Sequence, residues 1–270
     1  MSANAGTDAG RENGGSDELY VGYLPETPPR LARFVRGTVV LLGLLTAALA
    51  SVLALLQSSF DPGVFEFGST RTLEGRVVER PYPALLLAPP ATGEEPPGAP
   101  ATHLLLVEPG KHGAQNRVAG LEGAHARVTG TLAARPDLAV FELAAAPERL
   151  GSLRDDGEVP SAPLREVVLR GEIVDAKCFA GVMKPGRGKV HRSCAARCIA
   201  GGIPPVFVAA APRGGVEIYL LVDADGEPVG ERVLEWVGEP IELRGLAEPR
   251  GDQTLLRADL EQVVRLGSTR

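Results

Sequence analysis

The chain has 270 residues, enough for one large domain or two small ones, and its 33 glycines and 23 prolines favour short strands and turns over long helices. The formal net charge of −6 argues against a general nucleic-acid-binding protein, so no nucleic-acid partner is expected. Its 3 cysteines are an odd number, which excludes a complete set of disulfides within one chain.

The N-terminal region predicts a membrane anchor. Residues 1–36 are expected to form a disordered cytoplasmic tail. Residues 37–57 carry no charge and predict a transmembrane helix, since about 20 residues cross a bilayer. Three arginines precede this stretch and the next basic residue is Arg71, which places the N-terminus in the cytoplasm and the later domains outside the bacterial inner membrane. A signal peptide cleaved after Ala48–Ala50 is the alternative, but the apolar run continues past that point.

After a linker at residues 58–71, the sequence shows an internal repeat. The segment Gly75–Glu79 resembles Gly171–Asp175, and Leu104–Glu108 resembles Tyr219–Asp223. The offset is 115 residues in the later match but 96 in the first. The second copy is therefore longer by 19 residues between its first and third strands.

Each copy predicts the same order of elements, on the basis of period-2 apolar spacing. Strands are expected at 73–78, 84–87, 103–107, 126–132 and 138–143, and at 167–174, 206–209, 217–222, 241–246 and 255–260. A short helical segment, at 115–122 or 230–237, lies between the third and fourth strand of each copy. This is the order of an OB-fold barrel. The expected fold class is mainly β, with two tandem OB-like five-stranded barrels (72–146 and 165–266) joined by a linker at 147–164.

The additional residues of the second copy lie in a segment, residues 176–205, that we call the cassette. It contains every cysteine of the chain. A helix over His191–Ile199 would place His191, Cys194 and Cys198 on one face, because successive residues turn by about 100°. With Cys178 from the preceding loop, these residues predict a tetrahedral site for a transition metal such as zinc.

Two other interpretations of the cysteines stay open. A disulfide between Cys178 and either Cys194 or Cys198 would leave one thiol over and suits an oxidising compartment. The third interpretation, after the metal site and the disulfide, is a redox-active thiol with His191 as its base. The chain has no C-x-x-C pair, so a thioredoxin-like motif is not indicated.

The cassette is also rich in cations. They alternate with glycine and proline, and no acidic residue lies among them, so we expect them to contact an anionic ligand, cofactor or partner. These candidate residues are Lys177, Lys184, Arg187, Lys189, Arg192 and Arg197. In the first copy, Lys111, His112 and His125 are expected to be surface residues.

The stretch from Lys177 to Pro205 fits the pattern KCxxGxMxPGxGKxHRxCAxxCIxGGxPP. It resembles the signature of an uncharacterised family of bacterial single-pass membrane proteins. The resemblance covers about thirty residues of the chain and implies a membrane-anchored protein, but it implies no reaction.

Together these features predict a membrane-anchored extracytoplasmic binding or accessory module. Its cassette would bind a metal or cofactor, together with an anionic ligand or a protein partner in the membrane or periplasm. A membrane redox or cofactor-assembly system is the kind of assembly such a module would serve. The alternatives are a thiol-redox protein and a disulfide-stapled interaction module without chemistry. The sequence shows no nucleophile–base motif or phosphate-binding glycine loop, so an enzyme is not indicated.

Overall fold

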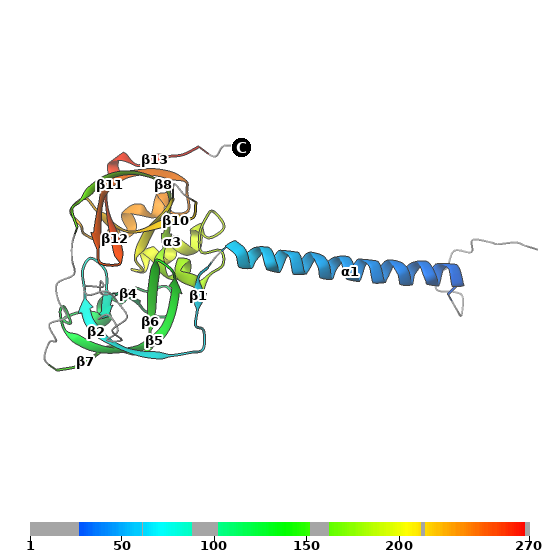
Figure 1. Cartoon of the computed structure of the whole chain (residues 1–270), viewed down its shortest axis with the longest axis horizontal. Helices are drawn as coiled ribbons and strands as arrows, with labels where there is room; N and C mark the ends of the chain where they lie inside the picture. The colour runs from blue at the N-terminus through cyan, green and yellow to red at the C-terminus, as the bar shows by residue number, and fades with distance from the viewer. Residues whose placement is uncertain (1–26, 61, 88–101, 152–161, 212–213, 268–270) are drawn as a thin grey trace, which may run out of the picture. The chain divides into compact units, whose positions relative to one another are not determined.

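The computed structural model describes residues 27–60, 62–87, 102–151, 162–211 and 214–267 (Figure 1). The chain divides into two compact units, Met1–Leu56 and Gln57–Arg270. Most of the predicted tail and much of the predicted linker at 147–164 lie outside the described residues.

The long helix α1 (Pro29–Phe60), drawn in blue in Figure 1, forms most of the described part of the first unit and ends four residues beyond it. Proline is well suited to the first position of a helix, because its missing N–H would have no partner there. The 32 residues give a length of about 48 Å. By length and composition α1 can cross a membrane, and its apolar side chains are exposed. The helix begins earlier than the predicted 37–57, because the arginines before residue 37 are good helix formers.

The first barrel contains five main strands and closes on itself. These are β2 (Arg71–Val78), β3 (Ala84–Leu87), β4 (Thr102–Val107), β5 (His125–Arg135) and β6 (Leu138–Leu143). Their order is β5-β2-β3-β4-β6, and a β5–β6 pairing completes the ring. The short strands β1 (Val64–Phe65) and β7 (Glu148–Arg149) also pair with β5. The helix α2 (Gln115–Val118) lies between β4 and β5 and is shorter than predicted.

The second barrel has the same connectivity. Its strands are β8 (Arg165–Asp175), β9 (Pro205–Ala210), β10 (Val216–Asp223), β11 (Ile241–Arg250) and β12 (Gln253–Ala258). The order β12-β10-β9-β8-β11 closes through a β11–β12 pairing, and β13 (Val264–Arg265) extends β11. The predicted helix between the third and fourth strands is a 3₁₀ helix, η2 (Gly230–Trp236), and a second one, η3 (Leu260–Gln262), follows β12.

Both barrels pair their third and fifth strands in parallel, β4 with β6 and β10 with β12. The other pairings within each ring are antiparallel, as in an OB-fold. The predicted fold class is therefore confirmed. Gly171 shows why the first strand needs a glycine, because a Cβ there would lie 2.1 Å from the carbonyl oxygen of Val208.

Each barrel has an apolar interior, and a third cluster joins the two. Phe141 and Leu104 belong to the first interior, and Phe207 and Leu221 to the second. The joining cluster contains residues of both barrels and of the cassette, including Phe179. The two barrels and the cassette therefore share a continuous buried contact.

Tyr82 is the clearest polar connection between the barrels. Its side chain is buried, and its hydroxyl donates to the carbonyl oxygen of Leu221 at 2.8 Å. The hydroxyl oxygen of Tyr82 also accepts the backbone N–H of Val229 at 3.2 Å. Burial raises the pKa of Tyr82, so it stays a neutral donor.

We therefore expect Tyr82→Phe to destabilise the full-length protein by about 1–3 kcal/mol, because two buried backbone groups of the second barrel lose their partner. Chemical denaturation measures the free energy of unfolding. Tyr219→Phe is the matched control, since its hydroxyl donates to Glu217, whose side chain is exposed and stays solvated. An equal cost for both substitutions would contradict the assigned role of Tyr82.

Candidate metal centre

The cassette leaves the second barrel at the end of β8 and returns at the start of β9. It forms a π-helical turn, η1 (Cys178–Val182), then a loop, and then the helix α3 (Arg192–Ala200). The predicted helix His191–Ile199 agrees with α3 to within one residue at each end. Gly186 lets the loop fold back over η1, because a Cβ at that position would lie 2.6 Å from the carbonyl oxygen of Cys178.

A buried carboxylate contacts the beginnings of both helical elements of the cassette. Asp175 is fully buried at the end of β8. One of its oxygens accepts the backbone N–H of Cys178 at 2.8 Å, and the other lies 3.0 Å from Nε2 of His191. His191 is also buried and precedes the first residue of α3. The beginnings of η1 and α3 are therefore held to the same side chain.

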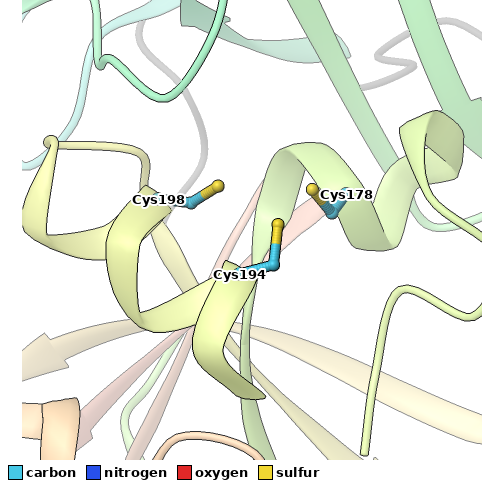
Figure 2. A group of neighbouring side chains, drawn as sticks. All are labelled: Cys178, Cys194 and Cys198. Carbon is cyan, nitrogen blue, oxygen red and sulfur yellow. The ribbon is translucent and has the colours of Figure 1, made fainter. Parts of the chain in front are cut away.

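This arrangement brings the three cysteines together. Cys194 and Cys198 lie one turn apart on α3, and Cys178 faces them from η1. Figure 2 shows their sulfur atoms directed toward a common space, and the three sulfurs lie within 4.8 Å of one another. All three cysteines are free. Around a tetrahedral zinc ion with Zn–S bonds of about 2.3 Å, sulfur atoms are separated by about 3.8 Å, so a small contraction would fit an ion.

His191 belongs to a second group that overlaps the first. Asp175, Cys178 and His191 place one potential ligand atom each within 4.8 Å of one another. The four residues predicted to form one metal site are thus divided between two groups that share Cys178. A single Cys₃His site remains a prediction.

Lys111 is the residue of this centre that the sequence did not reveal. Expected to be a surface residue, it is half-buried and donates from Nζ to the sulfur of Cys194 at 2.8 Å, with Cys198 at 3.6 Å. It belongs to the loop between β4 and α2 in the first barrel. Nothing in the local sequence marks it, because its contact with the cysteines depends on how the barrels pack.

Backbone contacts hold the Lys111 loop against the end of α3. The N–H of Gly113 donates to the carbonyl oxygen of Gly201 at 2.9 Å, and the side chain of Gln115 donates to that of Gly202 at 2.8 Å. A Cβ at Gly201 would lie 1.8 Å from the carbonyl oxygen of Lys111. Because Gly201 has no Cβ, the Lys111 loop can approach the end of α3 closely enough for Lys111 to reach the cysteines.

The sulfur atoms differ in how readily they ionise. A hydrogen bond with Cys198, burial and the negative charge of Asp175 all raise the pKa of Cys178. The hydrogen bond from Cys178, assisted by the charge of Lys111 and opposed by burial, lowers the pKa of Cys198 to about 7. Hydrogen bonding to Cys194 raises the pKa of Lys111, which therefore stays an ammonium. Cys178 is therefore the thiol of this pair that keeps its proton, and Cys198 is the one that ionises more readily.

The cassette cations differ in their burial and in their ion pairs. Lys177 is buried, forms an ion pair with Glu142 and donates to the carbonyl oxygens of Glu108 (3.0 Å) and Gly110 (2.9 Å). It therefore connects the cassette to the first barrel. Arg192 forms an ion pair with Glu239. The remaining four are exposed: Lys184, Arg187, Lys189 and Arg197.

Comparisons with protein-family models, with curated proteins and with solved structures gave no match for this chain. The resemblance of the cassette to a family of membrane proteins therefore stays a prediction.

In metal-free full-length protein, we expect one thiolate to form with a midpoint near pH 7, as the pKa of Cys198 indicates. The thiolate absorbance in the ultraviolet follows this titration. Lys111→Met should raise the midpoint, because it removes a positive charge that stabilises the thiolate. Lys189→Met, which removes an exposed lysine of the same cassette, should leave it unchanged. The same midpoint in all three proteins would show that Lys111 has no effect on the cysteines.

Proposed function

We propose that the protein is a membrane-anchored metal-binding accessory module that acts outside the cytoplasm. Cys178, Cys194 and Cys198 would bind a transition metal ion such as zinc. The observation that carries this proposal is the meeting of three free thiols, from two separate elements, within 4.8 Å. Thiolates are preferred ligands of soft and borderline metal ions.

The charges around the cysteines support this assignment. Three thiolates and one divalent ion have a net charge of −1, and the ammonium of Lys111 would balance it. Lys111 already contacts two of the three sulfurs. A donor of this kind orients metal ligands and is commonly as necessary as the ligands themselves.

The Asp175–His191 pair supports a fourth ligand. Metal-bound histidines usually have their second ring nitrogen hydrogen-bonded to a carboxylate or carbonyl. Nε2 of His191 is engaged by Asp175, which leaves Nδ1 as the ring atom able to bind a metal. His191 also shares a group with Cys178, one of the three thiols. We therefore retain the predicted Cys₃His set, Cys178, His191, Cys194 and Cys198.

The cellular setting follows from α1 and the charges beside it. Its apolar stretch would cross the inner membrane with the N-terminus in the cytoplasm, because three arginines precede that stretch. Both barrels would then lie outside the cytoplasm. The exposed cations of the cassette would contact an anionic ligand or a partner protein, in the service of a membrane redox or cofactor-assembly system.

Elemental analysis of the purified full-length protein tests the metal assignment. We expect about one equivalent of a transition metal per chain, and a loss of most of it in Cys194→Ser, because one of three thiolate ligands is removed. Ser193→Ala is the control, since this exposed neighbour on α3 faces away from the cysteines in the predicted helical wheel. Wild-type protein without stoichiometric metal would remove the metal function.

A thiol-redox function is the second candidate, and the protonated Cys178 beside the Cys198 thiolate favours it. In that case the sulfur of Cys198 would attack a disulfide of a partner, and Cys178 would then displace the partner from the mixed disulfide. The pair would become a disulfide, and the S–S bond of the partner would be reduced to two sulfhydryl groups, one of which takes the proton of Cys178. Cys198 is the thiol with the lowered pKa, so it should react with an alkylating reagent at mildly acidic pH faster than an ordinary thiol.

The alkylation rate of Cys198, compared with that of a free thiol, separates the candidates. A rate no faster than that of an ordinary thiol would argue against redox chemistry. A comparison of the intact mass before and after reduction would identify the third alternative, in which a disulfide cross-links the cassette.

A further inference from the structure

A pocket of about 700 Å³ lies between the cassette loop and the strands β8 and β9 of the second barrel. Arg170–Glu172 and Val208–Ala210 contribute from the strands, and Arg187–Lys189 from the loop. The volume falls within the range of small-molecule binding sites, about 300–1,000 Å³. None of the three cysteines lines this pocket, so it is separate from the candidate metal centre.

Hydrogen bonds hold in place the part of the cassette loop that lines the pocket. The backbone N–H of Gly188 donates to the carboxylate of Glu172 at 2.7 Å, and the carbonyl oxygen of Gly188 accepts the N–H of His191 at 3.0 Å. Gly188 has a φ of 76°, a left-handed conformation that glycine adopts readily. The two side chains that flank it, Arg187 and Lys189, are thereby held at the rim.

The rim is cationic. Among the described residues, Arg187 and Lys189 have no acidic partner, whereas Arg170 is paired with Glu242 at 3.0 Å. Glu172 is the one acidic residue of the lining, and the N–H of Gly188 already partly compensates its charge. The lining therefore has an excess of positive charge with two cations left for a ligand.

The other walls are apolar. Val208, Ala209 and Val216 contribute from β9 and β10, and Pro240 and Leu266 from the other side. Apolar walls beneath a cationic rim are complementary to a molecule with an apolar body and an anionic head. A free inorganic anion would leave the apolar walls unused, and a volume of about 700 Å³ is small for a segment of a folded partner.

We infer that this pocket binds an amphipathic anion, a single-chain molecule with a phosphate or carboxylate head. The head would contact Arg187 and Lys189, and the chain would cover Val208, Val216 and Leu266. This inference rests on the anionic-ligand part of the proposed function and is independent of the metal. The loop that supplies both cations is also part of the segment that supplies the cysteines, so the cassette would serve two sites.

Octyl phosphate is a suitable probe, titrated calorimetrically into the full-length protein in phosphatidylcholine nanodiscs, with empty nanodiscs subtracted. We expect saturable binding of one molecule per chain. Inorganic phosphate should bind at least about tenfold more weakly, because it lacks the apolar chain. Octyltrimethylammonium, which has a similar chain and the opposite charge, should show no saturable binding.

The double variant Arg187→Ala/Lys189→Ala should weaken octyl phosphate binding by at least about tenfold, because it removes both charge-assisted contacts. Arg197→Ala is the matched control, since Arg197 is an exposed cation of the same cassette that does not line the pocket. Metal content is measured in the same samples. Binding of octyl phosphate to protein without metal would leave this inference standing and remove only the metal function.

Four results would overturn the inference. The first is no saturable binding above that of empty nanodiscs. The second is equal affinity of octyl phosphate for the wild type and the double variant, and the third is equal affinity of the wild type for inorganic phosphate. A loss of binding in Arg197→Ala as large as in the double variant would also overturn it, since diffuse charge rather than this pocket would then attract the probe.

Discussion

The cassette depends on one buried carboxylate. Asp175 receives the backbone N–H at the start of η1 and contacts His191 at the start of α3, so a segment with several glycines and prolines is held at two points. A carboxylate buried without partners would be very unfavourable, and these two contacts compensate its charge. Because both elements are held to the same side chain, Cys178 lies opposite Cys194 and Cys198. The candidate metal centre depends on that placement.

The first barrel completes the centre without containing any cysteine. Lys111 supplies an ammonium to the sulfurs, and Glu142 pairs with the buried Lys177. Removing one member of a buried ion pair is costly, since the other is left with an uncompensated charge. The first barrel is therefore in contact with the cassette at two places, through Lys111 and through Glu142. Tyr82 and the shared apolar cluster maintain the packing on which these contacts rely.

The sequence predicted the fold class well and the centre in part. The alternation of apolar residues and the glycines of the first strands are local signals in the sequence. The ten main strands therefore lie close to where they were expected. The helical spacing of Cys194 and Cys198 was likewise local, and it correctly placed them on one face. The six cassette cations looked equivalent in the sequence, but Lys177 is buried and paired, Arg192 is half-buried and paired, and the other four are exposed.

By itself the sequence determined the apolar helix, the order of strands in each barrel and the segment that carries all the thiols, because periodicity and composition encode these features over a few residues at a time. Only the tertiary structure decided that Lys111 contacts the cysteines, that Asp175 holds His191, and that Arg187 and Lys189 border a pocket. Each of these features joins residues distant in the chain, so it depends on how the barrels and the cassette pack. No local pattern records that packing, since it results from the burial of apolar surface contributed by several segments at once.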